Sequence, residues 1–173
     1  MIDTTKINKN HVKKQIVNEF GEDKWTECQG KLYSQYLEFA TPFPGVIETI
    51  QNFKKMGSSL NIVSHKTKFP YVGEKVNLID KSNEWIKNNL VDTENKPLFE
   101  EKQIWFTESI KHKISTILKI EATIFIDDLK HVLDELPEQI EGIWFNPDNG
   151  SENTDSYKNW EEIRNKIWQM NSI

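Results

Sequence analysis

The alternation of short apolar runs with amphipathic segments after Leu60 is the feature that most constrains how this chain can fold. Four runs rich in β-branched and aromatic residues are each followed by a segment with helical periodicity. The four runs are Leu60–Val63, Ile104–Phe106, Thr123–Ile126 and Ile143–Phe145. Alternation of this kind is typical of a mainly parallel sheet sandwiched between helices. The sequence therefore predicts an α/β fold of the Rossmann-like type.

The pattern of the first forty residues differs from that of the rest and predicts helices. Val12, Ile16 and Phe20 recur every four residues, and Gly21 interrupts the run. A second apolar stripe extends from Trp25 to Phe39 and predicts one continuous helix. We therefore expect two segments, a helical insert over residues 1–40 and an α/β core over residues 41–173. Further helices are expected after Pro44, around Trp85, after Thr107 as N-cap, through Val132, and from Tyr157 through Ile167.

Charge and composition exclude several classes of protein. The chain has 27 acidic and 22 basic side chains and a formal net charge of −5, which argues against a nucleic-acid-coating protein. Its single cysteine, Cys28, excludes an internal disulfide framework and a cysteine-based metal site. No run reaches the ~18 apolar residues of a membrane span, and the N-terminus lacks a signal-peptide pattern. We expect a cytoplasmic protein without a nucleic-acid or membrane partner.

A hydroxyl residue, Ser64, directly follows the first apolar run. In parallel α/β sheets, ligands bind beyond the carboxyl ends of the strands, where a hydroxyl and backbone amides can hold a phosphate oxygen. The following residues, His65, Lys66 and Thr67, are candidates for contact with an anionic substrate. The simpler alternative is a turn capped by serine, with a solvated loop behind it.

Two adjacent carboxylates, Asp127 and Asp128, follow the third apolar run. Such a pair is costly at a strand end unless a positive charge lies beside it, and Mg²⁺ binds through one or two carboxylates plus water. The alternative is that Asp128 caps the next helix while Asp127 is merely exposed.

A lysine near the start of the preceding helix completes the pattern. Lys111 lies sixteen residues before Asp127, and Lys113 is an equally plausible candidate on spacing alone. A helical lysine considered alone is usually a solvated surface charge. The hydroxyl, the lysine and the paired acids, taken together in this order along the chain, indicate more than each does separately.

In that order the chain resembles the haloacid-dehalogenase-like (HAD-like) phosphohydrolase superfamily. Ser64 resembles its second motif, Lys111 its third, and Asp127-Asp128 its fourth. Ile62-Val-Ser-His-Lys-Thr67 and Phe125-Ile-Asp-Asp-Leu129 are similar to a small, mostly uncharacterised bacterial group of that superfamily.

The resemblance implies Mg²⁺-dependent hydrolysis of a small phosphorylated molecule. Ser64 would hydrogen-bond the phosphoryl group, Lys111 would neutralise its charge, and Asp127 and Asp128 would hold Mg²⁺. Specificity would lie in the helical insert, where Trp25 and Gln29 are candidates to face a ligand. The alternative for both is a packing role, which we favour for Trp25. The identity of the substrate is not encoded in any motif.

The chain departs from the family at one decisive point. The family's nucleophile is the first aspartate of an Asp-x-Asp pair that ends a central strand, and here Asp3 follows only Met1-Ile2, with Thr5 at the second position. We therefore expect a truncated or incomplete chain whose first central strand, between those ending at Ser64 and Asp127, is absent. It would be completed by another chain or a homo-oligomer, and the alternative is a catalytically inactive binding or interaction module.

Overall fold

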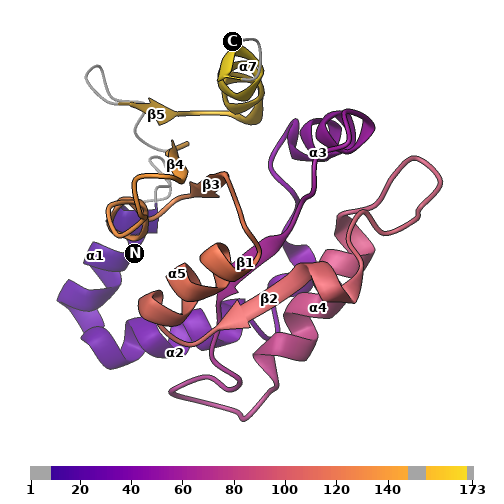
Figure 1. The fold of residues 1–173 in the computed structure, drawn as a ribbon. Coiled ribbons are helices and arrows are strands. Elements are labelled where there is room, and N and C mark those ends of the chain that lie inside the picture. The colour runs from indigo at the N-terminus through magenta and orange to yellow at the C-terminus, as the bar shows by residue number, and fades with distance from the viewer. Residues whose placement is uncertain (1–8, 148–154, 171–173) are drawn as a thin grey trace. The chain divides into compact units, whose positions relative to one another are not determined.

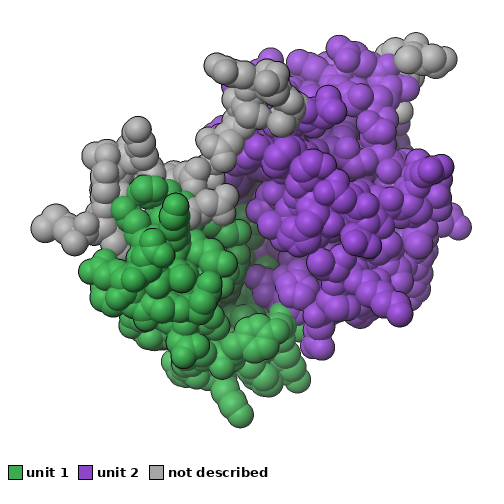
Figure 2. All heavy atoms as spheres, turned by 90° about the vertical axis from the view of Figure 1, so that its left-hand side faces the viewer, with its two compact units in different colours: residues 1–40, 67–85 green, residues 41–66, 86–173 purple. Residues whose placement is uncertain are grey.

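The computed structural model describes residues 9–147 and 155–170. The chain divides into two compact units, coloured separately in Figure 2. The first unit contains the described residues up to Ala40 together with Thr67–Trp85, and the second contains Thr41–Lys66 and the described residues from Ile86 onward. The stretch Thr67–Trp85 thus groups with the N-terminal helices, although the sequence analysis placed it in the core segment.

The first unit is built around the helix pair α1 (Lys9–Phe20) and α2 (Glu22–Leu32), which pack against each other. Gly21 joins them with φ of 86°, a left-handed conformation that glycine adopts without strain. The two predicted helices are confirmed, together with the break at Gly21.

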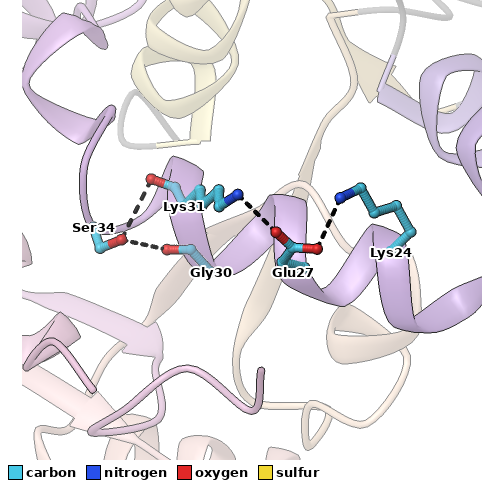
Figure 3. Close-up of polar contacts among 5 residues, drawn as sticks. All are labelled: Lys24, Glu27, Gly30, Lys31 and Ser34. Atoms are coloured by element: carbon cyan, nitrogen blue, oxygen red, sulfur yellow. Dashed lines mark hydrogen bonds and ion pairs between the residues drawn. The ribbon is translucent and has the colours of Figure 1, made fainter. Parts of the chain in front are cut away.

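The second helix is shorter than its apolar stripe predicted. It ends at Leu32, and a short 3₁₀ helix, η1 (Leu37–Phe39), follows. The Ser34 hydroxyl donates to the Gly30 carbonyl at 2.7 Å (Figure 3), and the Tyr36 amide donates to the Lys31 carbonyl at 3.1 Å. These bonds turn the chain away from the helix axis, so the prediction of one helix through Phe39 was wrong.

Charged side chains pair along α2, as Figure 3 shows. Glu27 pairs with Lys31 at 2.6 Å and with Lys24 at 2.9 Å. Hydrogen bonds from Lys31 and then Lys24 lower the pKa of the Glu27 carboxyl to about 2. Trp25 is 6% exposed and Gln29 is half-buried. Trp25 is therefore a packing residue.

The strands of the described residues all lie in the second unit, and every pair of them is parallel. They form two separate sheets (Figure 1), one of two strands and one of three. The first sheet is β1 (Ile62–His65) with β2 (Ile104–Thr107), and the second runs in the order β3 (Ile124–Asp127), β4 (Glu141–Phe145), β5 (Ser156–Tyr157). The predicted α/β fold with parallel strands is confirmed, whereas the two-residue β5 has no signal in the sequence.

The remaining helices follow the predicted alternation. They are α3 (Val46–Lys55), α4 (Leu78–Asn89), η2 (Glu101–Gln103), α5 (Ile110–Lys119), α6 (Lys130–Leu133) and α7 (Trp160–Met170). Tyr157 belongs to β5 instead of the last helix, because it pairs with Phe145. None of the helices described is long and apolar enough to cross a membrane.

Two apolar clusters hold the second unit together. In the first, α3 and α7 pack on one face of β3 and β4, with Phe53, Ile143 and Ile163 buried at its centre. In the second, Val63 and Ile117 are buried with the half-buried Phe125, so that α5 contacts both β1 and β3. Helices therefore cover both faces of the parallel strands, as continuous apolar strands require.

The N-cap of α5 is Ser109, so the expectation that Thr107 caps this helix was wrong. Thr107 is the last residue of β2, where it pairs with His65. Two residues later, the Ser109 hydroxyl accepts a hydrogen bond from the His112 amide at 3.1 Å. The β1–β2 ladder extends one residue further than the apolar run indicated.

The two serines at α5 test this placement of the cap. We expect Ser109→Ala to lower the free energy of unfolding by about 1 kcal/mol, because an orphan amide of the first turn loses its acceptor. Ser115→Ala, in the interior of the same helix, is the matched control and should be neutral or slightly stabilising, since alanine has the higher helix propensity. Urea denaturation of both variants measures the difference, and equal effects would contradict the assignment.

Candidate functional site

The polar residues singled out in the sequence lie at the carboxyl ends of two strands. Ser64 is the third residue of β1, and Asp127 is the last residue of β3. The two strands belong to different sheets.

A buried ion pair is the central feature of this edge. The Lys113 ammonium, on α5, contacts Oδ2 of Asp127, and the two side chains are only 7% and 6% exposed. The other carboxylate oxygen of Asp127 accepts the Leu129 amide at 2.9 Å. The ammonium also lies 5.2 Å from the centre of the Phe125 ring. Both oxygens of Asp127 are thus engaged, which fixes the carboxylate at the end of β3.

Of the two candidate lysines, the structure brings Lys113 to Asp127, while Lys111 is exposed. Two residues on a helix are separated by about 200°, so the two lysines face opposite sides. Lys113 lies four residues before the fully buried Ile117 and therefore shares the inward stripe of α5. The position of Lys113 on the apolar stripe of α5, and not its spacing to the aspartates, distinguishes it from Lys111.

Asp128 projects from the turn that follows β3 and is exposed. The Trp144 indole donates to its backbone carbonyl at 3.2 Å, so the neighbouring strand holds the turn. The N-cap position of α6 is Leu129, and no side chain caps that helix. Asp128 is therefore not the helix cap that the sequence left open as an alternative.

Thr107 fixes the segment that contains Ser64, a role that the sequence analysis missed. It is 1% exposed, and its hydroxyl lies 3.4 Å from the Ser64 carbonyl oxygen, while its own carbonyl accepts the Lys66 amide at 2.9 Å. The strand pairing of Thr107 with His65 places these contacts together. These contacts exist because of the register in which β1 pairs with β2, and no local sequence motif predicts that register.

The three residues after Ser64 have different environments. His65 is exposed, whereas Lys66 is half-buried, and its partial burial lowers the pKa of its ammonium to about 8. Thr67 belongs to the first unit, where its hydroxyl donates to the Phe69 carbonyl at 2.8 Å. Lys66 is therefore the cation that the second unit carries directly after β1.

Strand alternation sets where a shared ligand could lie. Val63 packs in the cluster beneath α5, so the Ser64 side chain projects from the opposite face of β1. Asp127 faces α5, where it meets Lys113. A ligand that contacts both Ser64 and Asp127 must lie beyond the carboxyl ends of the strands, which is where ligands bind in parallel α/β sheets.

Two adjacent carboxylates, Asp127 and Asp128, lie at this edge. Within residues 9–147 and 155–170, no group of three or more histidine, cysteine, aspartate or glutamate side chains is placed to hold a metal. Mg²⁺ in proteins is commonly held by one or two carboxylates, with water and substrate phosphate completing the octahedron. Asp127 and Asp128 supply two carboxylates of this kind, although both oxygens of Asp127 already accept bonds, from Lys113 and from the Leu129 amide.

Comparisons with protein-family profiles, with curated protein sequences and with solved structures find no match for this chain.

The ion pair predicts unequal effects of two lysine substitutions in one helix. We expect Lys113→Met to lower the free energy of unfolding by about 3–5 kcal/mol, because the Asp127 carboxylate is left buried without its partner. Lys111→Met, two residues away and exposed, should change it by less than about 0.5 kcal/mol. Chemical denaturation measures both, and equal effects would show that the pair contributes nothing at this position.

Proposed function

We propose that this chain carries the phosphate- and metal-binding half of a Mg²⁺-dependent phosphohydrolase of the HAD-like type, acting on a small phosphorylated molecule. The observation that carries the proposal is the buried contact of Lys113 with Asp127 at the carboxyl end of β3. Neither residue type is easily kept in a core, and both lie where the parallel fold binds ligands.

The energetics of the pair favour a functional role over a purely structural one. Taking two charges out of water costs several kcal/mol per ion, and apolar residues of similar size are often neutral or stabilising replacements. A buried ion pair is thus a poor way to stabilise a domain. It is a suitable way to hold a cation where a phosphoryl group gains charge during transfer.

Each residue of the edge has a definite task in this proposal. The Ser64 hydroxyl would donate to a phosphoryl oxygen, and Lys113 would offset the charge of the group as it transfers. Lys66 would attract the anionic substrate to the end of β1. Asp127 and Asp128 would hold Mg²⁺, which when bound neutralises phosphate oxygens.

The finer fold assignment belongs to the same proposal. In a HAD-type core, the two sheets would form one continuous sheet with a further strand between β1 and β3. That strand would bring the nucleophilic carboxylate that the family's chemistry requires. The separation of the strands into the sets β1–β2 and β3–β4–β5 supports this reading.

A catalytically inactive binding module is the second candidate. It is favoured by one observation: no Asp-x-Asp pair ends any strand among residues 9–147 and 155–170. Both candidates expect phosphate binding at this edge. They differ in turnover, because only the hydrolase releases phosphate once a strand ending in Asp-x-Asp is supplied.

The binding step can be tested on the chain alone. We expect inorganic phosphate, titrated by calorimetry in the presence of MgCl₂, to bind at least about tenfold more weakly to Ser64→Ala and to Asp128→Asn, since each loses a contact to a charged ligand. Asp134→Asn, which removes an exposed carboxylate beyond the edge, is the control and should bind like the unaltered chain. Equal phosphate affinity in all three variants would remove the site from consideration.

Turnover requires a chain that also carries the nucleophile. In such a protein we expect Asp127→Asn to abolish the Mg²⁺-dependent release of phosphate from p-nitrophenyl phosphate, because the metal loses a ligand held at the end of β3. Undiminished Mg²⁺-dependent release would refute the metal assignment, and release that is absent even before substitution would favour the binding module.

The partly buried position of Lys66 predicts a pH dependence with a definite sign. Its pKa of about 8 lies below the ordinary 10.5, so the ammonium loses its proton as pH rises through 8. Sulfate keeps its charge over this range, and we expect its affinity to fall up to about tenfold from pH 7 to pH 9. Lys66→Arg should remove the fall, because arginine stays protonated. A pH-independent affinity in the unaltered chain would exclude Lys66 from the site.

The same shift affects stability in the opposite direction. Between about pH 8 and 10.5 the folded chain binds fewer protons at Lys66 than the unfolded chain does. The contribution of this residue to the free energy of unfolding therefore rises with pH across that window. Comparing Lys66→Met with the unaltered chain isolates the contribution.

A further inference from the structure

A cavity of the second unit lies where the first turns of α3 and α7 meet. The two helices pack against each other and cover one face of β3 and β4 (Figure 1). The cavity has a volume of about 390 Å³, and small-molecule sites commonly measure about 300–1,000 Å³. Its walls include Gly45, Glu48, Thr49, Asn159, Glu161 and Arg164, none of which belongs to the proposed phosphate site.

Contacts within the core hold the walls of this cavity in place. The Phe145 ring, at the end of β4, lies edge-on to the Phe43 ring at 5.0 Å and 5.6 Å from the Trp160 ring. The Thr49 hydroxyl, which is 1% exposed, lies 3.5 Å from the Trp160 carbonyl oxygen. The turn ahead of α3 and the start of α7 are therefore fixed to the same strand and to each other.

Arg164 is the only arginine of the chain, since all the other members of its 22 basic residues are lysines. Its side chain is 16% exposed, its Nη1 pairs with Glu48 at 2.6 Å, and its guanidinium carbon lies 5.3 Å from the centre of the Trp168 ring. The ring and the carboxylate together orient the guanidinium plane. Lysine serves every other basic position, so this position uses what lysine lacks, which is a planar fork of donors.

Two donors beside the cavity have no acceptor among the described residues. One is the buried Nε of Arg164, and the other is the buried indole nitrogen of Trp160, which lies between the wall residues Asn159 and Glu161. A buried donor without an acceptor costs about 1–3 kcal/mol. Glu48 engages Nη1, so the edge that Nε forms with the second terminal nitrogen is the one that another carboxylate would use.

The charges of the walls decide which kind of carboxylate fits. Glu48 and Glu161 stand against the single guanidinium of Arg164. A purely anionic ligand would add a third negative charge, which the two nearby carboxylates disfavour. A ligand that carries an ammonium group beside its carboxylate offsets this repulsion, because the ammonium group gives Glu161 a partner of opposite charge.

We propose that the cavity between the first turns of α3 and α7 binds an amino-acid zwitterion. Its carboxylate would accept hydrogen bonds from the Nε edge of Arg164, and its ammonium group would lie against Glu161. The bound molecule would link α3 to α7. This site does not rest on the proposed function, because it shares no residue with the phosphate site.

The first measurement is thermal unfolding of the full chain with each standard amino acid in turn, because a ligand that binds only the folded state raises the midpoint. The amino acid with the largest shift is then compared by calorimetry with two of its parts, the acid without the amine and the amine without the carboxylate. We expect each part to bind at least about tenfold more weakly than the intact amino acid, since each lacks one charge-assisted contact.

Three variants assign the contacts. Arg164→Lys keeps the positive charge beside Glu48 but has no fork, so we expect affinity for the amino acid to fall at least about tenfold. Glu161→Gln should weaken binding of the amino acid while the acid without the amine binds no more weakly. Lys166→Met, on the same helix and paired with Glu141 at 3.6 Å, is the matched control and should bind like the unaltered chain.

Four results would overturn the proposal. The first is a midpoint that no amino acid raises, and the second is an Arg164→Lys variant with unchanged affinity. The third is an acid without the amine that binds as tightly as the amino acid, which would make the ligand a simple carboxylate. The fourth is loss of amino-acid binding in Ser64→Ala or Asp128→Asn, which would place the ligand at the phosphate site instead.

Discussion

The contact between Lys113 and Asp127 is the interaction on which the arrangement of the second unit's polar edge depends. It joins α5, which packs on β1 and β2, to the end of β3 in the other sheet. Few side-chain contacts among the described residues are so buried. A buried charge without its partner costs several kcal/mol. The pair therefore fixes α5 over β3 and, at the same time, holds a carboxylate where parallel strands bind ligands.

Apolar packing offsets the desolvation free energy that burying this ion pair costs. Ile117, Ile143 and Ile163 are essentially inaccessible, and they lie in the two clusters that cover opposite faces of the strands. Burying a side chain of this size contributes about 1.5–3 kcal/mol. The apolar residues of β3 are only half-buried and contribute less. Ser64 and Asp127 lie on strands of different sheets.

Features that depend on neighbouring residues were predicted from the sequence more successfully than features that depend on residues distant in the chain. Helices α1 and α3 and the apolar centres of β1 to β4 were predicted because periodicity and β-branched runs are local signals. The ends of elements were predicted less well: α2 stops at Leu32, and the cap of α5 is Ser109 instead of Thr107. In the first case, the hydrogen bond of the Ser34 hydroxyl ends a helix that the apolar periodicity would have continued. In the second, pairing with β1 keeps Thr107 in the strand, so that the helix begins two residues later.

The sequence by itself determined the α/β class, the parallel alternation and the order of Ser64, the lysine and the paired aspartates, because each is written in neighbouring residues. The tertiary structure alone decided which lysine meets Asp127, since helix rotation against the core separates Lys113 from Lys111. It also decided that Thr67 belongs to the first unit and that the strands divide into two sheets. Those facts depend on pairing between residues distant in the chain, and no local pattern encodes such pairing.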